Sequence, residues 1–464
     1  MKRALLLMVA LAGCKAVRAP DRPMIALPPE FLLAPIAAGE AASLRTLLPR
    51  DQAFARLNAI AQADAPTLEA AIARIDRARA QVRSARAEQF PDIAASGAVT
   101  GQRIGAQQLN NVPPGVIVDR NILVAQAGVQ ASYDPDLFGG LRASRRAAAA
   151  RLDAADADAR AVRLALTSDV ASAVVDWQAL GQQAALARGD LDQATTLTEI
   201  TGERVRVGVS SETDRVRAAG LAADARARLA LIDSRRAQVV GRLVTLIARP
   251  ARDVSALLDA TSVSLAADLE GGVPTGISTA MLRNRPDVAA AEARLRAADQ
   301  EIAAAAAQRF PRLTLSAVVG VAALAFGDLF DAGALTGSVG PSLAGPLLDF
   351  GRVGARIDQS QATAREAFAD YRRLTFTALG EAETSFGQTR AADARVAELR
   401  QQVAFNEDAA RLVEVRYRSG LDNFVGVVDA RRQAFASRQA LAIAIGEARM
   451  ARIALFRALG GAEL

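Results

Sequence analysis

The chain has 464 residues, of which 51% are hydrophobic and only 4% aromatic. It contains no histidine, which excludes histidine-based zinc sites, Ser-His-Asp triads and imidazole proton shuttles. Its 56 basic and 50 acidic residues leave a net charge of +6, but they are interleaved at helical spacings such as that of Glu292 and Arg296. We interpret them as a solvated helix surface and expect no nucleic-acid partner.

The N-terminus has the pattern of a bacterial lipoprotein signal. Two basic residues precede the apolar stretch 4–12, which is too short to span a bilayer. The stretch ends in Leu11-Ala12-Gly13-Cys14, which resembles a lipobox, and Cys14 is the only cysteine of the chain. We therefore expect residues 1–13 to be a signal peptide and Cys14 to be acylated. Lys15 at the next position favours onward transport to the outer membrane.

Residues 14–66 are predicted to form an acylated tether and an equatorial segment, because their first part is rich in proline and alanine. A first helix follows over 67–89, where Leu68 and Ile72 begin an apolar stripe. Phe90-Pro91 ends this helix, since the residue before a proline is disfavoured in the helical region.

Two segments of alternating polarity come next, at about 92–103 and about 123–134. Between them lies a loop rich in asparagine, proline and glycine, residues 110–115. Alternating segments of about ten residues are the weak signature of outer-membrane barrel strands. A soluble sheet of two hairpins gives the same alternation, and these residues alone leave that alternative open.

A very long helix is predicted over 141–206, a stretch without proline. At about 1.5 Å of rise per residue it would be roughly 100 Å long. Alanine occupies many positions of its apolar stripe, which lets neighbouring helices approach closely. After a glycine turn a shorter helix returns over 212–248, and residues 249–280, which contain proline, glycine and serine, are predicted to be an equatorial linker.

The chain then repeats itself, so that residues 67–248 form one copy and residues 281–464 a second. The second copy predicts strands at about 312–324 and 335–345, a long helix over 353–418 and a returning helix over 424–459. The matching motifs differ by 212 positions, from Gly208 to Gly420 and from Phe138-Gly139 to Phe350-Gly351, and by 220 positions, from Phe90-Pro91 to Phe310-Pro311.

Four strands in one chain cannot close a barrel. In lipid every backbone N–H and C=O must be paired, so only closed barrels survive, and eight strands are the usual minimum. We therefore expect several chains to combine. The same oligomer would bring several long helical hairpins together below the barrel, as a conduit from the periplasm to the exterior.

The chain resembles the TolC/OprM-like outer-membrane factors, within their lipoprotein (NodT-like) branch that serves RND-type efflux pumps. The motifs that carry the resemblance are Arg283-Asn284-Arg285-Pro286-Asp287-Val288, and Tyr417-Arg418-Ser419-Gly420-Leu421-Asp422-Asn423-Phe424 followed by Val428-Asp429-Ala430. The resemblance implies a mixed fold of a membrane β-barrel and a long α-helical barrel. It implies a homotrimer in which four strands per chain close a 12-stranded barrel above a helical tunnel.

As to function, the resemblance implies a lipid-anchored outer-membrane duct with a periplasmic helical domain. It would passively conduct drugs or other small molecules from an inner-membrane RND transporter and a periplasmic adaptor protein. It implies no enzymatic activity, no cofactor and no metal.

The resemblance also implies a gate at the periplasmic tip and a contact region for the adaptor. The residues of the gate and of the contact region fall near the two glycine turns. The gate would comprise Val425, Asp429, Thr213, Asp214 and Tyr417, with Asp214 and Tyr417 as a pair that favours closure. The turns that meet the adaptor would comprise Val207, Gly208, Val209, Ser419, Gly420 and Leu421. Asp422 and Gly426 depart from residues found in some members, which puts an inter-helix ion pair and a second acidic ring in doubt.

Three other classes of function fit the sequence less well. A type I secretion duct for proteins shares the architecture but usually lacks the acyl anchor. A structural envelope lipoprotein would not need the alternating strand pairs. An enzyme is disfavoured because the sequence has no glycine-rich dinucleotide motif opening a helix after a strand, no P-loop and no nucleophile elbow. The transported substrate is not specified by the sequence.

Overall fold

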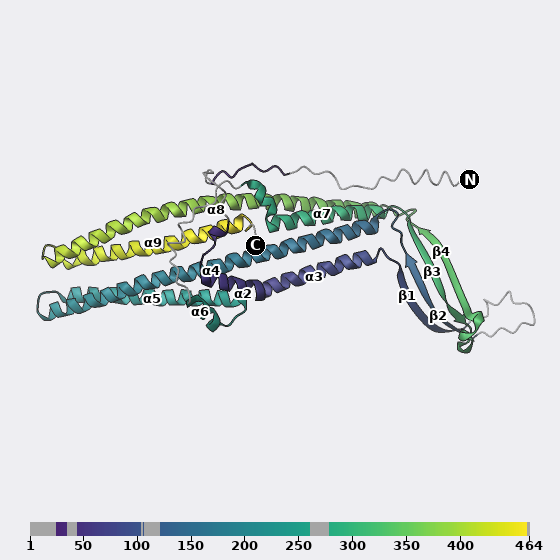
Figure 1. The fold of residues 1–464 in the computed structure, drawn as a ribbon, viewed down its shortest axis with the longest axis horizontal. Coiled ribbons are helices and arrows are strands. Elements are labelled where there is room, and N and C mark those ends of the chain that lie inside the picture. The colour runs from purple at the N-terminus through teal and green to yellow at the C-terminus, as the bar shows by residue number, and fades with distance from the viewer. Residues whose placement is uncertain (1–24, 35–43, 104, 106–120, 260–277, 462–464) are drawn as a thin grey trace, which may run out of the picture. The chain divides into compact units, whose positions relative to one another are not determined.

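The computed structural model describes residues 25–34, 44–103, 105, 121–259 and 278–461 (Figure 1). It divides into two compact units. The first comprises Ile75–Ala154 and Ala291–Asp370, and the second Met24–Arg74, Ala155–Ala290 and Tyr371–Leu464. Cys14 and the predicted signal peptide lie outside the described residues, so acylation stays a prediction. No helix in the described parts of the chain has the length and apolar character needed to cross a bilayer.

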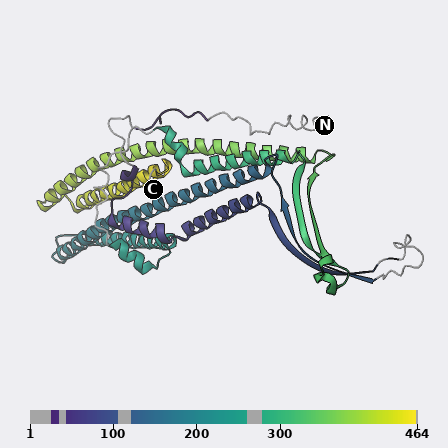
Figure 2. The same ribbon diagram turned by 45° about the vertical axis from the view of Figure 1, so that its right-hand side comes forward.

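The sheet of the first unit is antiparallel throughout, in the order β1-β2-β3-β4 (Figures 1 and 2). Its strands are β1 (Asp92–Arg103), β2 (Asn121–Tyr133), β3 (Arg312–Ala323) and β4 (Leu335–Ala344). The described residues thus confirm a helix-rich chain with four antiparallel strands. β1 and β4 are the edge strands, and their outer backbone groups have no strand partner in this sheet.

The strands alternate in polarity and expose their apolar side chains. In β4, Leu335, Val339 and Leu343 are 68%, 86% and 66% exposed, with Ser338 and Ser342 among the residues between them. The connection from β3 to β4 contains two short 3₁₀ helices, η5 (Phe326–Phe330) and η6 (Ala332–Ala334). An exposed apolar face of this kind fits an environment other than water.

The long helices of the two copies have equal lengths and matching bounds. α4 (Gly140–Arg206) and α8 (Arg352–Arg418) have 67 residues each, and both ends differ by 212 positions (352 − 140 and 418 − 206). Shorter helices precede each strand pair, namely α3 (Pro66–Ala87) and α7 (Pro286–Ala307). In the first unit, α7 packs on α8 through Ala305, Ala306, Val353 and Ile357, where the small alanines allow the helices to lie close.

The second unit contains the larger apolar core. Its further elements are η1 (Leu44–Leu47), α2 (Gln52–Asp64), α5 (Glu212–Ile247), α6 (Ala251–Asp259), η4 (Thr279–Asn284) and α9 (Phe424–Ala458). The centre of this core is fully buried, with Leu57, Leu243, Leu258 and Leu282 at 0% exposure. Figures 1 and 2 show α5 running back beside α4, and α9 beside α8.

Two segments are more ordered than the sequence predicted. Within the predicted tether and equatorial segment, α2 forms because Asp51 caps it: its carboxylate accepts a hydrogen bond from the Ala53 N–H at 2.9 Å. Within the predicted linker 249–280, α6 forms because Val254 and Leu258, four residues apart, are both buried in the core.

The first family-like motif has a structural role in this unit. Arg285 is 7% exposed, and its guanidinium donates to Asp287 and, at 2.8 Å, to Glu381 of α8. It also donates to the carbonyl of Ala458, the last residue of α9, at 2.7 Å. Arg285 therefore ties the start of α7 to the middle of α8 and the end of α9.

Candidate functional site

The two helical turns of the second unit share one backbone geometry. Gly208, between α4 and α5, has φ +74°, and Gly420, between α8 and α9, has φ +75°. These left-handed angles favour glycine and end a helix in the usual way. In each turn the next residue donates a backbone hydrogen bond five positions back, from Val209 to Arg204 at 2.8 Å and from Leu421 to Arg416 at 2.9 Å.

The apolar side chains of these turns are exposed. Val207, Val209 and Leu421 are 62%, 64% and 69% exposed, and Ser419 and the two glycines are exposed beside them. In this chain the predicted adaptor-contacting residues are therefore all accessible.

The start of α5 is closed by an acidic cap. The side chain of Ser211 accepts a hydrogen bond from the Asp214 N–H at 3.2 Å, and the Asp214 carboxylate accepts one from the Ser211 N–H at 3.2 Å. Ser210 donates to the same carboxylate at 3.0 Å. Burial acts to raise the pKa of Asp214, but these hydrogen bonds outweigh it and hold the pKa below its ordinary value. Thr213 lies exposed beside this cap.

The start of α9 is closed by a neutral cap. The Asn423 side chain accepts a hydrogen bond from the Gly426 N–H at 2.9 Å, and Asp422 accepts one from the Asn423 N–H at 2.8 Å. Asp422 also lies 3.5 Å from the Nε of Arg416. The two residues that depart from the family pattern thus take part in the turn itself. A Cβ at Gly426 would lie 3.0 Å from Asp422 Oδ1, which is a close contact.

Tyr417, near the end of α8, connects the helix pair α8–α9 to the helix pair α4–α5. It is half-buried at a small apolar cluster with Phe424 and Val428 of α9 and Leu197 of α4. Its ring centroid lies 6.1 Å from that of Phe424 and 5.2 Å from Cζ of Arg204 on α4. The structure thus gives Tyr417 and Asp214 separate neighbours within one chain. The contact of Arg204 was not predicted from the sequence, and its repeat counterpart, Arg416 (416 − 204 = 212), contacts Asp422 instead.

Val425 and Asp429 lie one turn apart on the same face of α9. Both are exposed, Val425 at 40%, whereas Phe424 and Val428, about 100° round the helix on the adjacent face, are buried. In one chain, therefore, an apolar and an acidic side chain are accessible, and the adjacent face packs α9 against its neighbours through Phe424 and Val428.

Arg228 connects three helices at a point farther from the turns, and the sequence did not predict this. Arg228 of α5 forms ion pairs with Asp190 of α4 and Asp224 of its own helix, and its Cζ lies 4.4 Å from the ring centroid of Phe435 on α9. Burial raises the pKa of Asp190, although Arg228 opposes the shift. Arg228 thus links three helices. An isolated arginine on a charged helix carries no sequence signal for this role.

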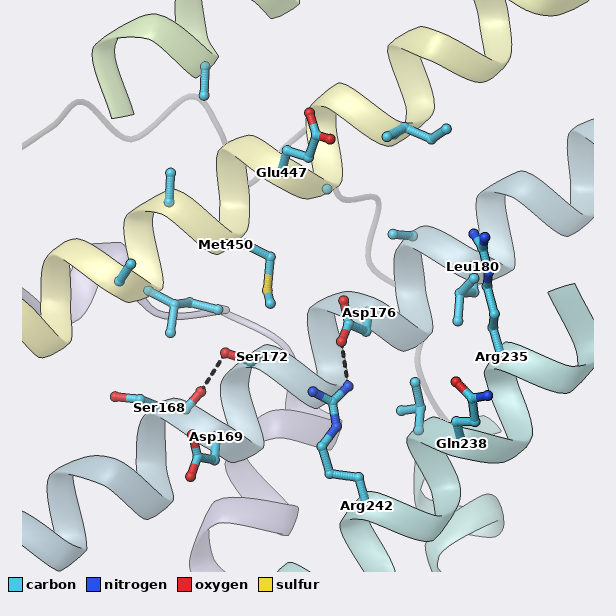
Figure 3. A pocket seen from close by; sticks show the side chains of 18 of the residues that line it. Ser168, Asp169, Ser172, Asp176, Leu180, Arg235, Gln238, Arg242, Glu447 and Met450 are labelled. Carbon is cyan, nitrogen blue, oxygen red and sulfur yellow. Dashed lines mark hydrogen bonds and ion pairs between the residues drawn. The ribbon is translucent and has the colours of Figure 1, made fainter. Parts of the chain in front are cut away.

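A cavity of about 1090 Å³ lies among α4, α5, α8 and α9. Figure 3 shows Asp176 paired with Arg242 and Ser172 donating to the carbonyl of Ser168, with Met450 projecting from α9. The lining mixes acidic, basic and apolar groups. In the described part of the chain, no group of three or more histidine, cysteine, aspartate or glutamate residues is placed to hold a metal ion.

The comparison with protein families gives one extended match. The outer membrane efflux protein family matches residues 57–249 and 277–461, which include both copies of the repeat.

Individual proteins match over nearly the same length. The pyoverdine export outer membrane protein OpmQ of Pseudomonas putida is 29% identical over 445 residues, 94% of this chain and 93% of that protein. The toluene efflux pump outer membrane protein TtgC of Pseudomonas putida is 31% identical over 398 residues, 85% of this chain and 80% of that protein. The solved open state of the MtrE outer membrane channel of Neisseria gonorrhoeae has a TM-score of 0.83 at 25% identity, with 96% of this chain and 98% of that chain covered.

Proposed function

This chain belongs to the outer membrane efflux protein family, and we propose on that premise that three copies form one duct that is gated at its periplasmic tip. The protein is an outer-membrane efflux channel with a periplasmic helical domain.

The open edges of the sheet are the observation that carries the proposed assembly. Among the described residues, β1 and β4 each have one side without a strand partner, and unpaired backbone groups are costly in lipid. Four strands are too few to close, whereas three copies supply twelve, within the range of known barrels. Closure through a homotrimer satisfies both edges of every chain.

The accessible face of α9 supports the proposed gate. A threefold assembly that turns this face inward forms a ring of Val425 and a ring of Asp429. The apolar ring would restrict water, as hydrophobic constrictions do, and the acidic ring would favour cations. Contact of a periplasmic adaptor with the exposed turns at Val207–Val209 and Ser419–Leu421 would separate the helices and open the passage.

The cargo we propose is a small molecule delivered by an inner-membrane RND transporter through the adaptor. Relatives with 29% and 31% identity are named for export of pyoverdine and efflux of toluene. These names favour small molecules over the proteins carried by a type I secretion duct. An acylated Cys14 would add a lipid anchor to the insertion of the barrel.

Native mass spectrometry of the full chain purified in detergent tests the proposed assembly. We expect a mass of three mature chains, each beginning at an acylated Cys14. A stable monomer would contradict closure by three chains. A mature N-terminus without acyl chains would contradict the anchor but leave the assembly intact.

A further inference from the structure

The two β-hairpins of the first unit repeat each other in register. Asp92 lies opposite Ser132 in the first hairpin, and Arg312 lies opposite Ala344 in the second. The first strands therefore differ by 220 positions (312 − 92) and the second strands by 212 (344 − 132). The same offsets relate Phe90 to Phe310 and Phe138 to Phe350, so each phenylalanine keeps its place relative to its strand.

The two β-hairpins meet within the chain where β2 pairs with β3, and we call this pairing the seam. Two features characterise it. The first is its register, in which Gln130 of β2 lies opposite Val318 of β3. The second is an aromatic stack just beyond the strands. The rings of Phe138 and Phe310 have centroids 4.6 Å apart and planes inclined by 13°.

The repeat counterparts of this seam are the two free edges. β4 is the counterpart of β2, and β1 is the counterpart of β3. The phenylalanines beside these edges are exposed, Phe350 at 90% and Phe90 at 59%, whereas Phe138 and Phe310 are half-buried. Phe350 also has φ +50°, an angle that non-glycine residues rarely adopt. An exposed aromatic ring on a strained backbone lacks, in one chain, a contact that its counterpart has.

We propose that the contact between subunits copies the seam within the subunit. β4 pairs antiparallel with β1 of the next copy, so that Ser342 lies opposite Ala98 of the partner subunit (130 + 212 and 318 − 220). Phe350 stacks on Phe90 of the partner subunit, as Phe138 stacks on Phe310. This inference rests on the proposed trimer and specifies the residues that close it.

The polarity of the two edges agrees with this register. Leu343 falls opposite Gly97 of the partner subunit, on the apolar face, and Ser338 falls opposite Gln102 of the partner subunit, on the polar face. A shift by one residue would turn every side chain of one strand to the wrong face. The register derived from the repeat is thus one of those that place apolar residues opposite apolar residues and polar residues opposite polar residues.

One of the two glycines that face each other at the seam has a glycine counterpart at the free edge. A Cβ at Gly128 of β2 would lie 3.0 Å from the carbonyl oxygen of Val319 on β3. Its counterpart, Gly340 of β4, has nothing within 4 Å of that position. The other glycine of the seam, Gly320 of β3, would place a Cβ 2.4 Å from the carbonyl oxygen of Ala127, and its counterpart on β1 is Thr100 (320 − 220). The edge therefore keeps the glycine of one strand only, and the open position at Gly340 has space for the side chain of Thr100 of the partner subunit.

Disulfide cross-linking in the full chain tests the register. Residues directly opposite in an antiparallel pair have Cα atoms about 4.5–5.5 Å apart, which a disulfide can bridge. Ser342→Cys combined with Ala98→Cys should give covalent trimers on a non-reducing gel, which reductant converts to monomers. Ser342→Cys with Ser96→Cys, shifted by two residues on the same face, is the matched control and should cross-link poorly.

Native mass spectrometry of the same variants separates this inference from the proposed function. Trimers in which the Ser96 pair cross-links better than the Ala98 pair would overturn the register and leave the trimer standing. Monomers would overturn the trimer and the register together.

A double-mutant comparison tests the aromatic stack. Phe350→Ala and Phe90→Ala should each lower the temperature at which the trimer dissociates in detergent, and the double variant should add little to either. Leu347→Ala, which removes a fully exposed side chain near Phe350, is the control and should have a smaller effect. Fully additive effects of the two phenylalanine variants would overturn the stack.

Discussion

The two glycine turns differ in chemistry although they share a backbone. Their glycines have φ angles of +74° and +75° and are followed by equivalent hydrogen bonds. The first turn leads into an acidic cap at Ser211 and Asp214, and the second into a neutral cap at Asn423. Repetition has therefore preserved the backbone and allowed the side chains around it to diverge.

The two returning helices differ in whether their first residue is buried. Phe424 is buried at the start of α9, whereas its repeat counterpart, Glu212 (424 − 212), is exposed at the start of α5. Val425 has Thr213 as its counterpart, and both are exposed. The α9 tip is thus held by an apolar anchor that the α5 tip lacks, and this difference can be tested.

The largest effect is expected from Phe424→Ala. Removing a buried phenylalanine typically costs about 3–5 kcal/mol, and the small cluster around Phe424 offers little compensation. We expect the first turns of α9 to lose protection in hydrogen exchange measured by mass spectrometry. Glu212→Ala is the control at the matching position and should leave α5 nearly unchanged. Equal loss of protection in both helices would show that the tips are not anchored differently.

An intermediate effect is expected from alanine at either turn glycine. Gly208→Ala and Gly420→Ala force a Cβ into a left-handed conformation, which costs roughly 1–2 kcal/mol. Neither position has an atom within 4 Å of the added Cβ, so the backbone alone sets the cost. Thermal unfolding in detergent should therefore show similar losses for both. A loss confined to one turn would contradict a shared backbone.

The smallest effect is expected from the caps, and it depends on pH. Ser211→Ala and Asn423→Ala should each cost about 1 kcal/mol. Because the folded state lowers the pKa of Asp214, its contribution is complete above the ordinary value of 3.8 and is lost as the pH falls through the folded value. Acid should therefore weaken the cap of α5 through this carboxylate, whereas the amide of Asn423 that caps α9 does not titrate.

Hydrogen exchange, corrected for intrinsic rates and compared at mildly and strongly acidic pH, checks this difference. Glu212 pairs with Arg215 in the same turn and also titrates in this range. Comparison with Asp214→Asn therefore identifies the share of the acid-induced loss of protection in α5 that is due to Asp214. An unchanged acid response in that variant would contradict the role of its carboxylate.

Much of the fold could be predicted from the sequence because each element occurs in both copies of the repeat. The long helices were predicted within one residue of their observed starts, since glycine and the absence of proline set their limits. α2 and α6 were missed because they are short, and their order depends on burial in a core that no local pattern reveals.

The site was predictable where it follows the turn motif and not where it depends on tertiary contacts. The positions of Val425 and Asp429 relative to Gly420 were implied by the resemblance to the family's turn motif, and the structure shows both side chains exposed. The contact of Arg204 with Tyr417, and that of Arg228 with Asp190 and Phe435, join residues of different helices. Arginine is so abundant along these helices that sequence alone does not distinguish a bridging residue from a solvated one.

Single-channel conductance in planar bilayers tests the central claim, that the tip of α9 gates an outer-membrane duct. Wild-type protein should show low, cation-selective conductance. Val425→Ala combined with Tyr417→Phe should raise it by widening the apolar ring and removing the hydroxyl that the expected pair of Tyr417 and Asp214 requires, and Asp429→Ala should reduce cation selectivity. Leu231→Ala, an exposed apolar residue of α5 away from the turn, should conduct like wild type. If the double variant also conducts like wild type and Asp429→Ala keeps its selectivity, the constriction does not lie at these residues.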